Sequence, residues 1–518
     1  MFLWIPAIAG VLLTFIPALY LARRSTERGT APWGDAMERL AGPLLRNSVE
    51  LAAAVAIACV VIAMPAAWLT ARTDIPGRRA WVMLLSLPLA IPSYVYAVAV
   101  VAALGPRGML QEWLEPFGVT RLPEIYGFWG AAGTLTAVAF PYLYLVLHAA
   151  FTTLDTAQEE ASRTLGHGAM STFLRVTLPP LRPALAAGVL LIVFYVLSDF
   201  GAVTALRFNT FTYAIFLQYQ SSFDRTGAAV LAIMLGCVSL LVLAAELAVR
   251  AMAKGSISTS QRRAPKPVRL GAWRWAGLGF LGTVISISLV MPVGVLVYWV
   301  VEGVRADTEF PDLLTPLRHS AVMAASGAAV TVLVALPIAL LAARYGGWAT
   351  RAIEQGSYLT HALPGLVIAL SLVFFGIRYG RDLYQTLWML ILAYVILFVP
   401  NALGTLRGPF LRQPPNLEEA GASLGRRPAR VLAAITLPLA RPGIAASYML
   451  VFLTTLKELP ATLLLSPPGY ETLPGIIWAA SNTGSIASAA LPALVLVAMA
   501  GLTIGILAWR GGIEGGVE

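Results

Sequence analysis

The chain has 518 residues, of which 58% are hydrophobic and 12% are charged, and its formal net charge is +10. Soluble domains are typically about 45–50% apolar and about 25% charged, so this composition excludes an ordinary soluble globular protein. Cys59 and Cys237 lie in separate apolar runs, which excludes a disulfide framework and a thiolate metal cluster. In a membrane protein Lys and Arg collect in cytoplasmic loops, so we interpret the basic excess as topology and predict no nucleic-acid partner.

Twelve apolar windows follow one another along the chain, each about as long as a helix that crosses a hydrocarbon core of roughly 30 Å. They cover residues 2–22, 46–71, 81–104, 128–151, 184–205, 228–249, 274–300, 318–343, 355–378, 385–407, 440–463 and 488–509. The first window has no basic segment before it and is followed directly by Arg23 and Arg24, which favours a retained span over a signal peptide. The predicted fold class is an all-α membrane protein with 12 transmembrane helices.

The distribution of basic residues predicts the orientation. With a cytoplasmic N-terminus, 22 Lys and Arg residues fall in inner loops and the C-terminal tail, against 13 in outer loops. This agrees with the positive-inside rule, and we therefore predict a cytoplasmic N-terminus. The exception is the loop at 23–46, whose five arginines would be external. Either the other loops outweigh it, or the first helix is placed differently.

An internal repeat divides the chain. Residues 159–188 match residues 418–447 without a gap at 12 of 30 positions, far above chance. Upstream, the matched positions are Asn47-Ser48 with His319-Ser320, Pro65 with Pro337, Arg72 with Arg344 and Pro92 with Pro364. Six helices is an even number, so both repeats enter the membrane in the same orientation, as parallel repeats. We predict a first six-helix repeat at 1–253, a cytoplasmic linker at 254–273 and a second six-helix repeat at 274–518.

The most similar parts of the repeats are two polar loops that the orientation places in the cytoplasm. Capping-box spacing occurs at Thr156 with Glu159 and at Asn416 with Glu419, and it predicts two short helices with acidic starts. Gly166 and Gly425 are placed to end these helices in the left-handed conformation. The same surface shape, presented twice, would suit docking to a symmetric soluble partner.

These loops resemble a motif of a known family, the EAA loop in the permease subunits of ABC importers. The two copies are Glu160-Ala161-Ser162…Gly166…Val176-Thr177-Leu178-Pro179 and Glu419-Ala420-Gly421…Gly425…Ile435-Thr436-Leu437-Pro438. They depart from the pattern only at small positions, where Ser162 and Gly421 replace the second alanine. Two six-helix units in one chain look like the fused permeases of iron(III) importers and their thiamine and polyamine relatives. The segments at 198–203 with 210–212, and at 457–462, look most like the iron(III) branch.

The resemblance implies a type I importer permease in the bacterial plasma (inner) membrane. It implies contact with an ATP-binding subunit, expected as a homodimer, through two sets of residues. These are Glu159, Glu160, Ala161, Gly166, Leu178 and Pro179 in the first loop, and Glu418, Glu419, Ala420, Gly425, Leu437 and Pro438 in the second. A periplasmic or lipid-anchored substrate-binding protein would deliver the cargo, and membrane lipid would surround the chain.

The same resemblance implies that ATP and Mg²⁺ are used by the partner subunit and that this chain is not an enzyme. The sequence agrees, because it contains no GxxxxGK[ST] phosphate-binding loop, and we expect no cofactor in this chain. Iron(III) is the expected cargo, with thiamine, polyamines or another small solute as alternatives. A secondary carrier driven by an ion gradient is a remote alternative, since carriers also commonly have twelve helices in two halves.

Two acidic residues, Asp199 and Glu458, lie toward the outer ends of the fifth and eleventh windows. They either reach the external surface or face the translocation path, where they would attract cations or bind metal directly. Our hypothesis assigns them to the path. His148 and His361 have no partners at ligand spacing, and we predict no metal site. Residues 421–425 match the hydrolase pattern GxSxG, but that motif needs a strand-to-helix turn that an all-helical chain does not supply.

Overall fold

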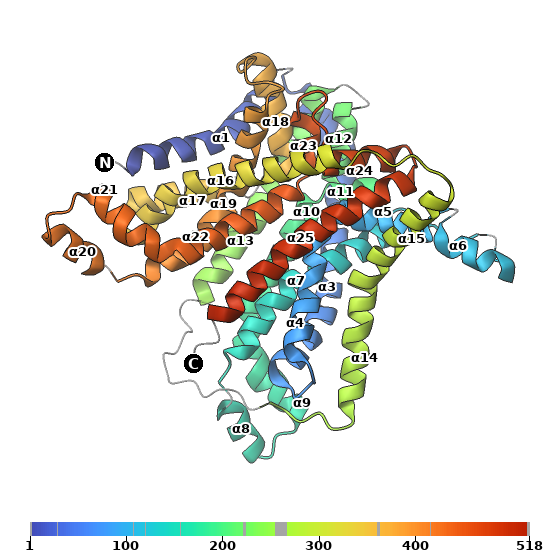
Figure 1. Ribbon diagram of the computed structural model, residues 1–518, viewed down its shortest axis with the longest axis horizontal. Coiled ribbons are helices and arrows are strands. Elements are labelled where there is room, and N and C mark those ends of the chain that lie inside the picture. The colour runs from blue at the N-terminus through green and yellow to red at the C-terminus, as the bar shows by residue number, and fades with distance from the viewer. Residues whose placement is uncertain are drawn as a thin grey trace. The chain divides into compact units, whose positions relative to one another are not determined.

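A computed structural model describes residues 3–27, 29–106, 108–119, 121–155, 157–220, 224–253, 267–359, 363–414 and 416–514 (Figure 1). These residues are mostly helical, with one isolated parallel bridge between Thr73 and Val268. Eleven helices in the described ranges are long and apolar enough to cross a membrane, and the shorter apolar helix Gly365–Arg378 lies within the predicted ninth window. The all-α membrane class is confirmed.

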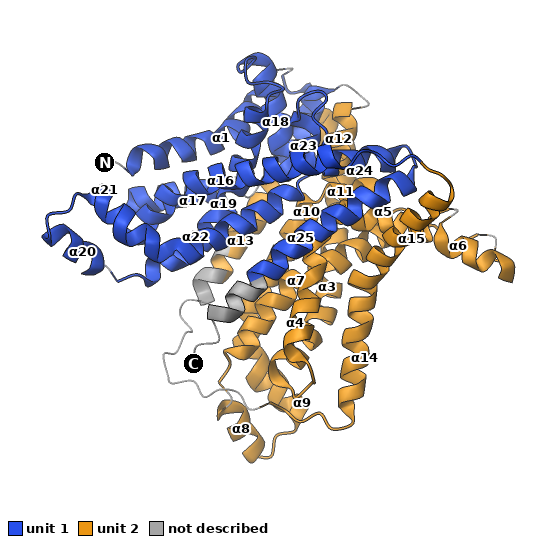
Figure 2. Ribbon diagram, in the orientation of Figure 1, with its two compact units in different colours: residues 1–33, 224–236, 309–518 blue, residues 34–223, 237–308 orange. Residues whose placement is uncertain are grey.

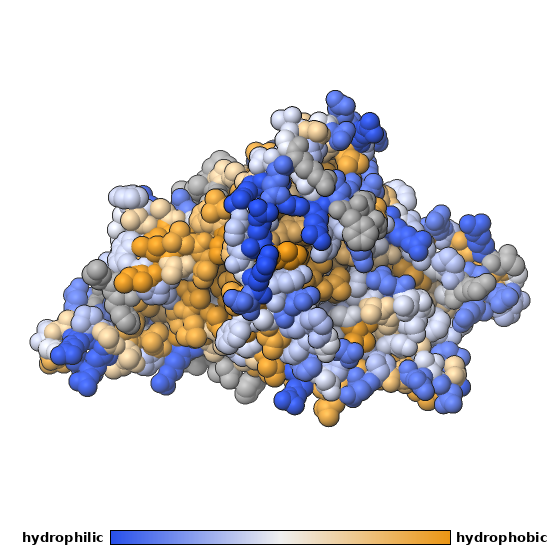
Figure 3. Space-filling view, turned by 90° about the horizontal axis from the view of Figure 1, so that it is seen from above, coloured by the Kyte–Doolittle hydropathy of each residue, from blue (hydrophilic) through white to orange (hydrophobic). Residues whose placement is uncertain are grey.

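The exposed faces of the long helices are as apolar as the buried ones. In α3 (Gly42–Arg72), Val55 and Cys59 are fully buried, whereas Ile57 and Val61 are about two-thirds exposed. A helix that is apolar all round is stable only when both faces meet apolar surroundings, and lipid supplies them for the outer face. Figure 3 shows the result on one side of the molecule, where broad apolar areas lie between separate polar clusters.

The chain forms two compact units, which Figure 2 colours separately. Unit 1 comprises Met1–Trp33, Asp224–Gly236 and Glu309–Glu518, and unit 2 comprises Gly34–Phe223 and Cys237–Thr308. Unit 1 contains α1 (Trp4–Thr26), α16 (Leu314–Arg344), α17 (Trp348–Leu359), α18 (Gly365–Arg378), α19 (Leu387–Arg412), α20 (Asn416–Ser423), α21 (Pro428–Val431), α22 (Leu437–Leu456), α23 (Pro460–Leu465), α24 (Leu473–Asn482) and α25 (Ile486–Glu514).

Unit 2 is built from the corresponding helices of the first repeat together with the opening helices of the second repeat. It contains α2 (Ala31–Asp35) from Gly34 onward, α3, α4 (Arg78–Ser86), α5 (Ser93–Leu104), α6 (Met109–Leu114), α7 (Phe128–Thr152), α8 (Ala157–Thr164), α9 (Ala169–Thr172), α10 (Leu178–Ser198), α11 (Gly201–Ala205), α12 (Phe211–Gln220), α14 (Trp273–Ile285) and α15 (Met291–Arg305). Helix α13 (Arg225–Ala253) begins in unit 1 and continues in unit 2 after Gly236.

The compact units and the predicted repeats divide the chain differently. Helix α1, from the start of the first repeat, packs against α16, α17 and α18 in unit 1. Helices α14 and α15, from the start of the second repeat, instead pack in unit 2, where α14 contacts α3 and α4, and α15 contacts α5. Each unit therefore joins the opening helix of one repeat to later helices of the other. The predicted repeat boundaries remain predictions, and residues 254–266 of the predicted linker lie outside the described residues.

Two predicted spans are interrupted at matched prolines. The window at 81–104 is divided into α4, a short 3₁₀ turn at Leu87–Ala90 and α5, which begins after Pro92. The window at 355–378 is likewise divided between α17 and α18, which begins after Pro364. Proline has no N–H to donate and disfavours helical backbone in the residue before it, and Ile91 is indeed extended at ψ 116°. These prolines therefore mark helix starts.

The predicted windows at 184–205 and 440–463 each run past the end of a helix. Helix α10 ends at Ser198 and α22 ends at Leu456, and the short helices α11 and α23 follow. Asp199 and Glu458 thus lie in two matched breaks between helices, not inside continuous spans. Hydropathy could not locate these breaks, because apolar residues continue on both sides of them.

Candidate functional site: two matched knobs

Each of the two repeated polar loops folds into two short helices followed by a π-helical turn. The first knob, residues 157–177, consists of α8, α9 and the turn Phe173–Thr177. The second knob, residues 416–436, consists of α20, α21 and the turn Leu432–Thr436. Both turns continue directly into spanning helices, and Leu178-Pro179 and Leu437-Pro438 begin those helices. Single π-helical turns are rare and often mark functional sites.

Glycines end the first helix of each knob as predicted. Gly166 has φ +85° and Gly425 has φ +75°, so both adopt the left-handed conformation that strongly favours glycine. The backbone N–H of His167 donates to the Ser162 carbonyl, and that of Arg426 donates to the Gly421 carbonyl, each at 3.2 Å. These bonds satisfy carbonyls that the end of a helix leaves without partners. The two turns therefore give both knobs the same outline.

The described residues cover the predicted capping boxes only in part. Thr156 lies outside the described residues, and in the first knob the N–H of Ala157 donates to the Asp155 carboxylate at 3.0 Å. The Glu159 carboxylate is directed to other partners. In the second knob Asn416 already belongs to α20. The acidic residues do lie in the first turns of α8 and α20, as the spacing predicted. In each helix the first of the two adjacent glutamates, Glu159 or Glu418, has a different role.

In each knob this glutamate contacts an arginine and a threonine, and we call the three residues an Arg–Glu–Thr clasp. In the first knob Glu159 accepts a hydrogen bond from Arg72 Nη2 at 2.5 Å and another from Thr177 Oγ1 at 2.9 Å. Arg72 is the last residue of the spanning helix α3, and only 3% of its side chain is exposed. The clasp therefore ties the knob to a spanning helix by a mostly buried ion pair, and removing one member would leave a buried charge uncompensated.

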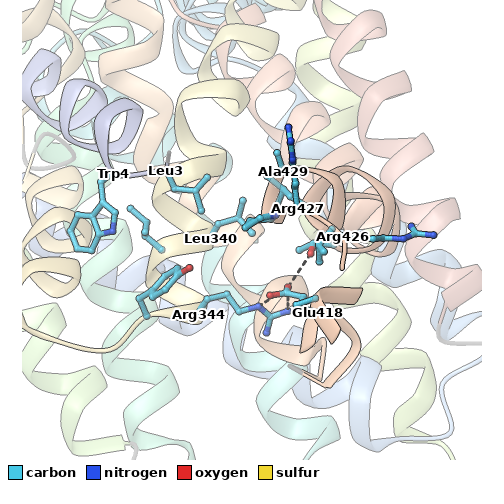
Figure 4. A pocket seen from close by; sticks show the side chains of 15 residues that line it. Leu3, Trp4, Leu340, Arg344, Glu418, Arg426, Arg427 and Ala429 are labelled. Carbon is cyan, nitrogen blue, oxygen red and sulfur yellow. Dashed lines mark hydrogen bonds and ion pairs between the residues drawn. The ribbon is translucent and has the colours of Figure 1, made fainter. Parts of the chain in front are cut away.

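The second knob repeats the clasp with Arg344, Glu418 and Thr436, and Figure 4 shows its Arg344 and Glu418 directed toward each other. Arg344 Nη2 lies 2.9 Å from Glu418 Oε1, and Thr436 Oγ1 donates to the same oxygen at 3.0 Å. Arg344 is the last residue of α16 and also donates from Nη1 to the Gln413 carbonyl at 2.9 Å. Glu418 is more exposed than Glu159, so we expect its pair to be more strongly screened by solvent.

The second acidic residue of each knob points outward. Glu160 and Glu419 are exposed, as are Ala161 and Ala420 beside them. At the helix ends Leu165 is 78% exposed and its matched residue Leu424 is 79% exposed. Large apolar side chains exposed next to charged ones, at the same place on both knobs, are typical of a docking surface. The predicted coupling residues thus divide into an inward pair, Glu159 and Glu418, an exposed set, and the half-buried Leu-Pro pairs that begin α10 and α22.

Each of the two departures from the EAA pattern, Ser162 and Gly421, is accommodated by neighbouring side chains in its own knob. Ser162 Oγ lies 3.1 Å from Thr172 Oγ1, in a buried hydroxyl pair. In the second knob Gly421 takes the place of Ser162, and a Cβ there would come within 2.9 Å of the Ile435 side chain and 3.1 Å of Val431. A larger apolar neighbour therefore fills the space that the serine side chain occupies in the first knob.

A cavity lies beneath each knob. The one under the first knob measures about 390 Å³ and is lined by Arg72, Glu159 and Val268, among others. The one under the second knob measures about 640 Å³, and Figure 4 shows Leu3 and Trp4 across it from Glu418 and Arg426. The segments that precede the opening helices α1 and α14 therefore reach equivalent cavities, one in each unit.

Asp199 and Glu458 cap the short helices that follow the two breaks. The N–H of Ala202 donates to Asp199 Oδ1 at 2.9 Å, and the N–H of Ala461 donates to Glu458 Oε1 at 3.2 Å. Asp199 is buried. A capping carboxylate satisfies N–H groups at a helix start, which gives both residues a structural task whether or not they face a path.

The two histidines considered as metal ligands, His148 and His361, give no evidence of a metal site in the described residues. His148 Nδ1 lies 3.1 Å from Thr70 Oγ1, a contact between helices α7 and α3, while His361 is outside the described residues. Within the described ranges, no group of three His, Cys, Asp or Glu side chains is arranged to hold a metal ion.

The repeat aligned three further pairs of residues, but the sequence alone did not indicate that they belong to the site. They are Arg72 with Arg344, Thr177 with Thr436, and Leu165 with Leu424. Each pair has the same residue in both repeats, and this identity was the available signal. It could not assign roles, because the arginines lie more than 70 positions before the carboxylates that they contact.

The duplicated knobs agree with the comparison to known families. A family described as "Binding-protein-dependent transport system inner membrane component" matches residues 54–255 and 335–509. The chain belongs to this family. The two matched segments fall one in each predicted repeat, and each contains a complete knob. Membership also argues against a carrier driven by an ion gradient, since the family works with a binding protein.

Among curated relatives of this family, the Fe(3+)-transport system permease protein FbpB 2 of Haemophilus influenzae is 34% identical over 502 residues, which cover 95% of either chain. The putative ferric transport system permease protein FbpB 1 of the same organism is 24% identical and covers 82% of this chain. The sulfate transport system permease protein CysW of Synechocystis is 30% identical over only 45% of this chain, which is 86% of its own length. CysW thus corresponds to about one half of this chain.

Proposed function

We propose that this family member is the permease of an ABC importer for iron(III) and that one chain supplies both halves of the substrate path. The observation that carries the proposal is the pair of knobs, each held by its own Arg–Glu–Thr clasp. The iron assignment is supported by the near full-length similarity to a permease named for Fe(3+) transport. Thiamine, a polyamine or another small solute remains the alternative cargo for the same machinery.

The ATP-binding subunit is the partner that the knobs fit. A homodimer would present two equal grooves, and the exposed Glu160, Leu165, Glu419 and Leu424 would enter them, one knob in each. ATP and Mg²⁺ would bind the partner alone, and a periplasmic or lipid-anchored binding protein would deliver iron(III). Because the clasps join the knobs to the ends of α3 and α16, closure of the ATP-binding dimer would move those helices.

The proposed orientation places the knobs and the N-terminus in the cytoplasm. Within unit 1, Leu3 and Trp4 line the cavity under the second knob, so the start of α1 lies on the knob side. Arg24, near the other end of α1, shares a cavity with Arg378, which the charge pattern places outside. This arrangement supports an external loop at 23–46, in spite of its arginines.

We further propose that the breaks at Asp199 and Glu458 lie along the path. Irregular backbone at membrane depth is tolerated only where it is buried in protein or lines a water-filled cavity. Replacing Asp199 with Asn and Glu458 with Gln keeps an oxygen that can cap the helix and removes the charge. Slower iron(III) uptake by this double variant would support attraction of cations, whereas unchanged uptake would leave only the capping task.

Reconstitution tests the proposed function. The permease, the ATP-binding subunit and the binding protein are placed in proteoliposomes, and uptake of radioactive iron(III) is followed. We expect uptake that needs all three proteins and hydrolysable ATP, with no competition from thiamine, spermidine or sulfate. An ATP-binding subunit that lacks its phosphate-binding lysine is the matched control. Uptake driven by a proton or sodium gradient without that subunit would contradict the proposal.

A further inference from the structure

An arginine-lined cavity of about 230 Å³ lies in unit 1 between the ends of α1 and α18, which pack against each other. Its charged lining consists of Arg24, Arg225, Arg378 and Arg381, and the aromatic rings of Tyr20 and Phe374 complete much of its wall. The residues that line it include no Asp or Glu. The four arginines come from three separate segments of the chain, so the fold gathers them at this point.

Arg24 shows how this positive charge is held. Its guanidinium group lies 5.6 Å from the centre of the Phe374 ring, and its Nη1 pairs with Glu27. Its Nε is buried and has no hydrogen-bond partner. A buried guanidinium N–H without a partner costs free energy, and an anion in the cavity would relieve that cost. Neighbouring Arg23 similarly lies over the ring of Tyr379, at 5.5 Å.

The size and chemistry of the cavity indicate a small oxyanion. Organic ligands usually occupy pockets of roughly 300–1,000 Å³, so this cavity suits a smaller group. Guanidinium groups form paired hydrogen bonds with phosphate oxygens, and several of them around one space repel each other unless an anion lies between them. The same charges repel metal cations, which separates this cavity from any path for iron.

The arginines are not a requirement of the fold. Unit 2 contains the equivalent helix ends at α5 and α15, and there Tyr298 Oη donates to the Glu112 carboxylate at 3.2 Å. Trp299 Nε1 donates to the Ala102 carbonyl, also at 3.2 Å. The described contacts at that end therefore involve aromatic side chains and a carboxylate, whereas the matched place in unit 1 gathers arginines.

We propose that this cavity binds a phosphate-type oxyanion, either free phosphate or the phosphate of an anionic lipid headgroup. Helix α1 has 23 residues and is about 35 Å long, so its two ends lie near opposite faces of a membrane. The site lies at the end away from the second knob, and its external location rests on the orientation proposed above. Binding itself does not depend on that orientation.

The test uses the purified full chain without its ATP-binding partner, so its outcome is independent of the transport proposal. Inorganic phosphate is titrated by calorimetry into protein held in phosphatidylcholine nanodiscs, at constant ionic strength in chloride. We expect saturable binding that Arg24→Gln and Arg378→Gln each weaken at least tenfold. Arg46→Gln is the matched control, since Arg46 belongs to the same basic stretch of sequence at 23–46 but lies exposed in α3, where it pairs with Glu50. It should bind phosphate as the natural protein does.

Weaker phosphate binding by the arginine variants could also result from misfolding, so a variant that should bind phosphate more tightly is included. Glu27→Gln removes the carboxylate that competes for Arg24, so phosphate should bind several-fold more tightly. Nanodiscs with phosphatidylglycerol then distinguish the two sources. If a lipid headgroup occupies the site, these nanodiscs abolish phosphate binding and Arg378→Gln reduces the phosphatidylglycerol retained by the protein; if free phosphate does, its binding persists.

Three results would overturn the proposal. The first is equal phosphate binding by the arginine variants and the Arg46→Gln control. The second is binding that chloride alone reproduces. The third is an effect of Arg378→Gln on capture of the binding protein, with no effect on phosphate or phosphatidylglycerol, which would assign the arginines to an acidic protein surface.

Discussion

Two pairs of residues next to the spans show how single side chains fix the path of the chain. In unit 2, Ser48 Oγ accepts the N–H of Phe211 at 3.3 Å, and in unit 1 Ser320 Oγ accepts the N–H of Leu473 at 2.8 Å. The residue before each serine bonds a nearby carbonyl of the same segment. The sequence repeat had aligned these residues without a reason, and their shared contact supplies it.

Ser320→Ala should lower the stability of the protein. The N–H of Leu473 would then be buried without a partner, at a cost of about 1–3 kcal/mol. Ser326→Ala in the same helix is the control, because Ser326 bonds only carbonyls of its own helix, and its effect should stay within about 0.5 kcal/mol. Thermal unfolding in detergent measures both. Equal melting temperatures for the two variants would contradict this role for Ser320.

The adjacent residues Glu159 and Glu160 have different roles, because Glu159 belongs to a clasp and Glu160 is exposed. Two substitutions test these roles separately. Arg72→Met leaves the Glu159 carboxylate without its cation, which should cost about 3–5 kcal/mol. Glu160→Gln changes an exposed charge and should leave the melting temperature almost unchanged, while weakening capture of the ATP-binding subunit. A stable Arg72→Met protein, or a Glu160→Gln protein with normal capture, would show that the assignment is wrong.

At the scale of elements, the sequence predicted where helices exist better than where they end. Windows of apolar residues located the long helices because lipid requires apolar side chains on every exposed face. The breaks before Gly201 and Pro460 were missed, because a capping carboxylate in an apolar run changes the backbone without changing the average hydropathy. The π-helical turns were also missed, since they depend on how each knob joins its spanning helix.

The glycine turns give a prediction for the knob helices. Gly166→Val and Gly425→Val place a β-branched residue at positive φ, which should distort the ends of α8 and α20. Both glycines have open space around the position of a Cβ, so backbone strain and not a clash would cause the effect. We expect ATP hydrolysis by the assembled complex to continue with little iron(III) uptake. Gly404→Val, within α19 and also with open space, is the control and should transport normally.

At the scale of the whole molecule, the exchange of opening helices was beyond sequence reasoning. The repeat indicated two similar halves, but no pattern in the chain told which half α1 or α14 would join. Packing decides this, because an apolar helix contacts whichever surface complements it. The family and the approximate position of the two knobs, by contrast, were readable from the repeated motif alone.

The exchange predicts that neither half is stable alone. Cutting the chain between Lys254 and Lys266 yields two fragments, and each compact unit contains helices from both of them. Fragments 1–260 and 261–518 should therefore be degraded when expressed singly and recovered together when co-expressed. Membrane abundance and co-purification measure this. A fragment that accumulates alone with a cooperative thermal transition would contradict the prediction.

The central claim is that one chain presents two equivalent docking knobs to an ATP-binding dimer. Leu165→Cys and Leu424→Cys, each made in a background with Cys59→Ala and Cys237→Ala, place a single thiol at the exposed end of each knob. Cross-linking to an ATP-binding subunit with one cysteine in its docking groove should succeed from either knob. With both thiols present, two subunits should be joined per chain. Cross-linking from one knob only, or a single subunit joined to the double variant, would contradict the claim.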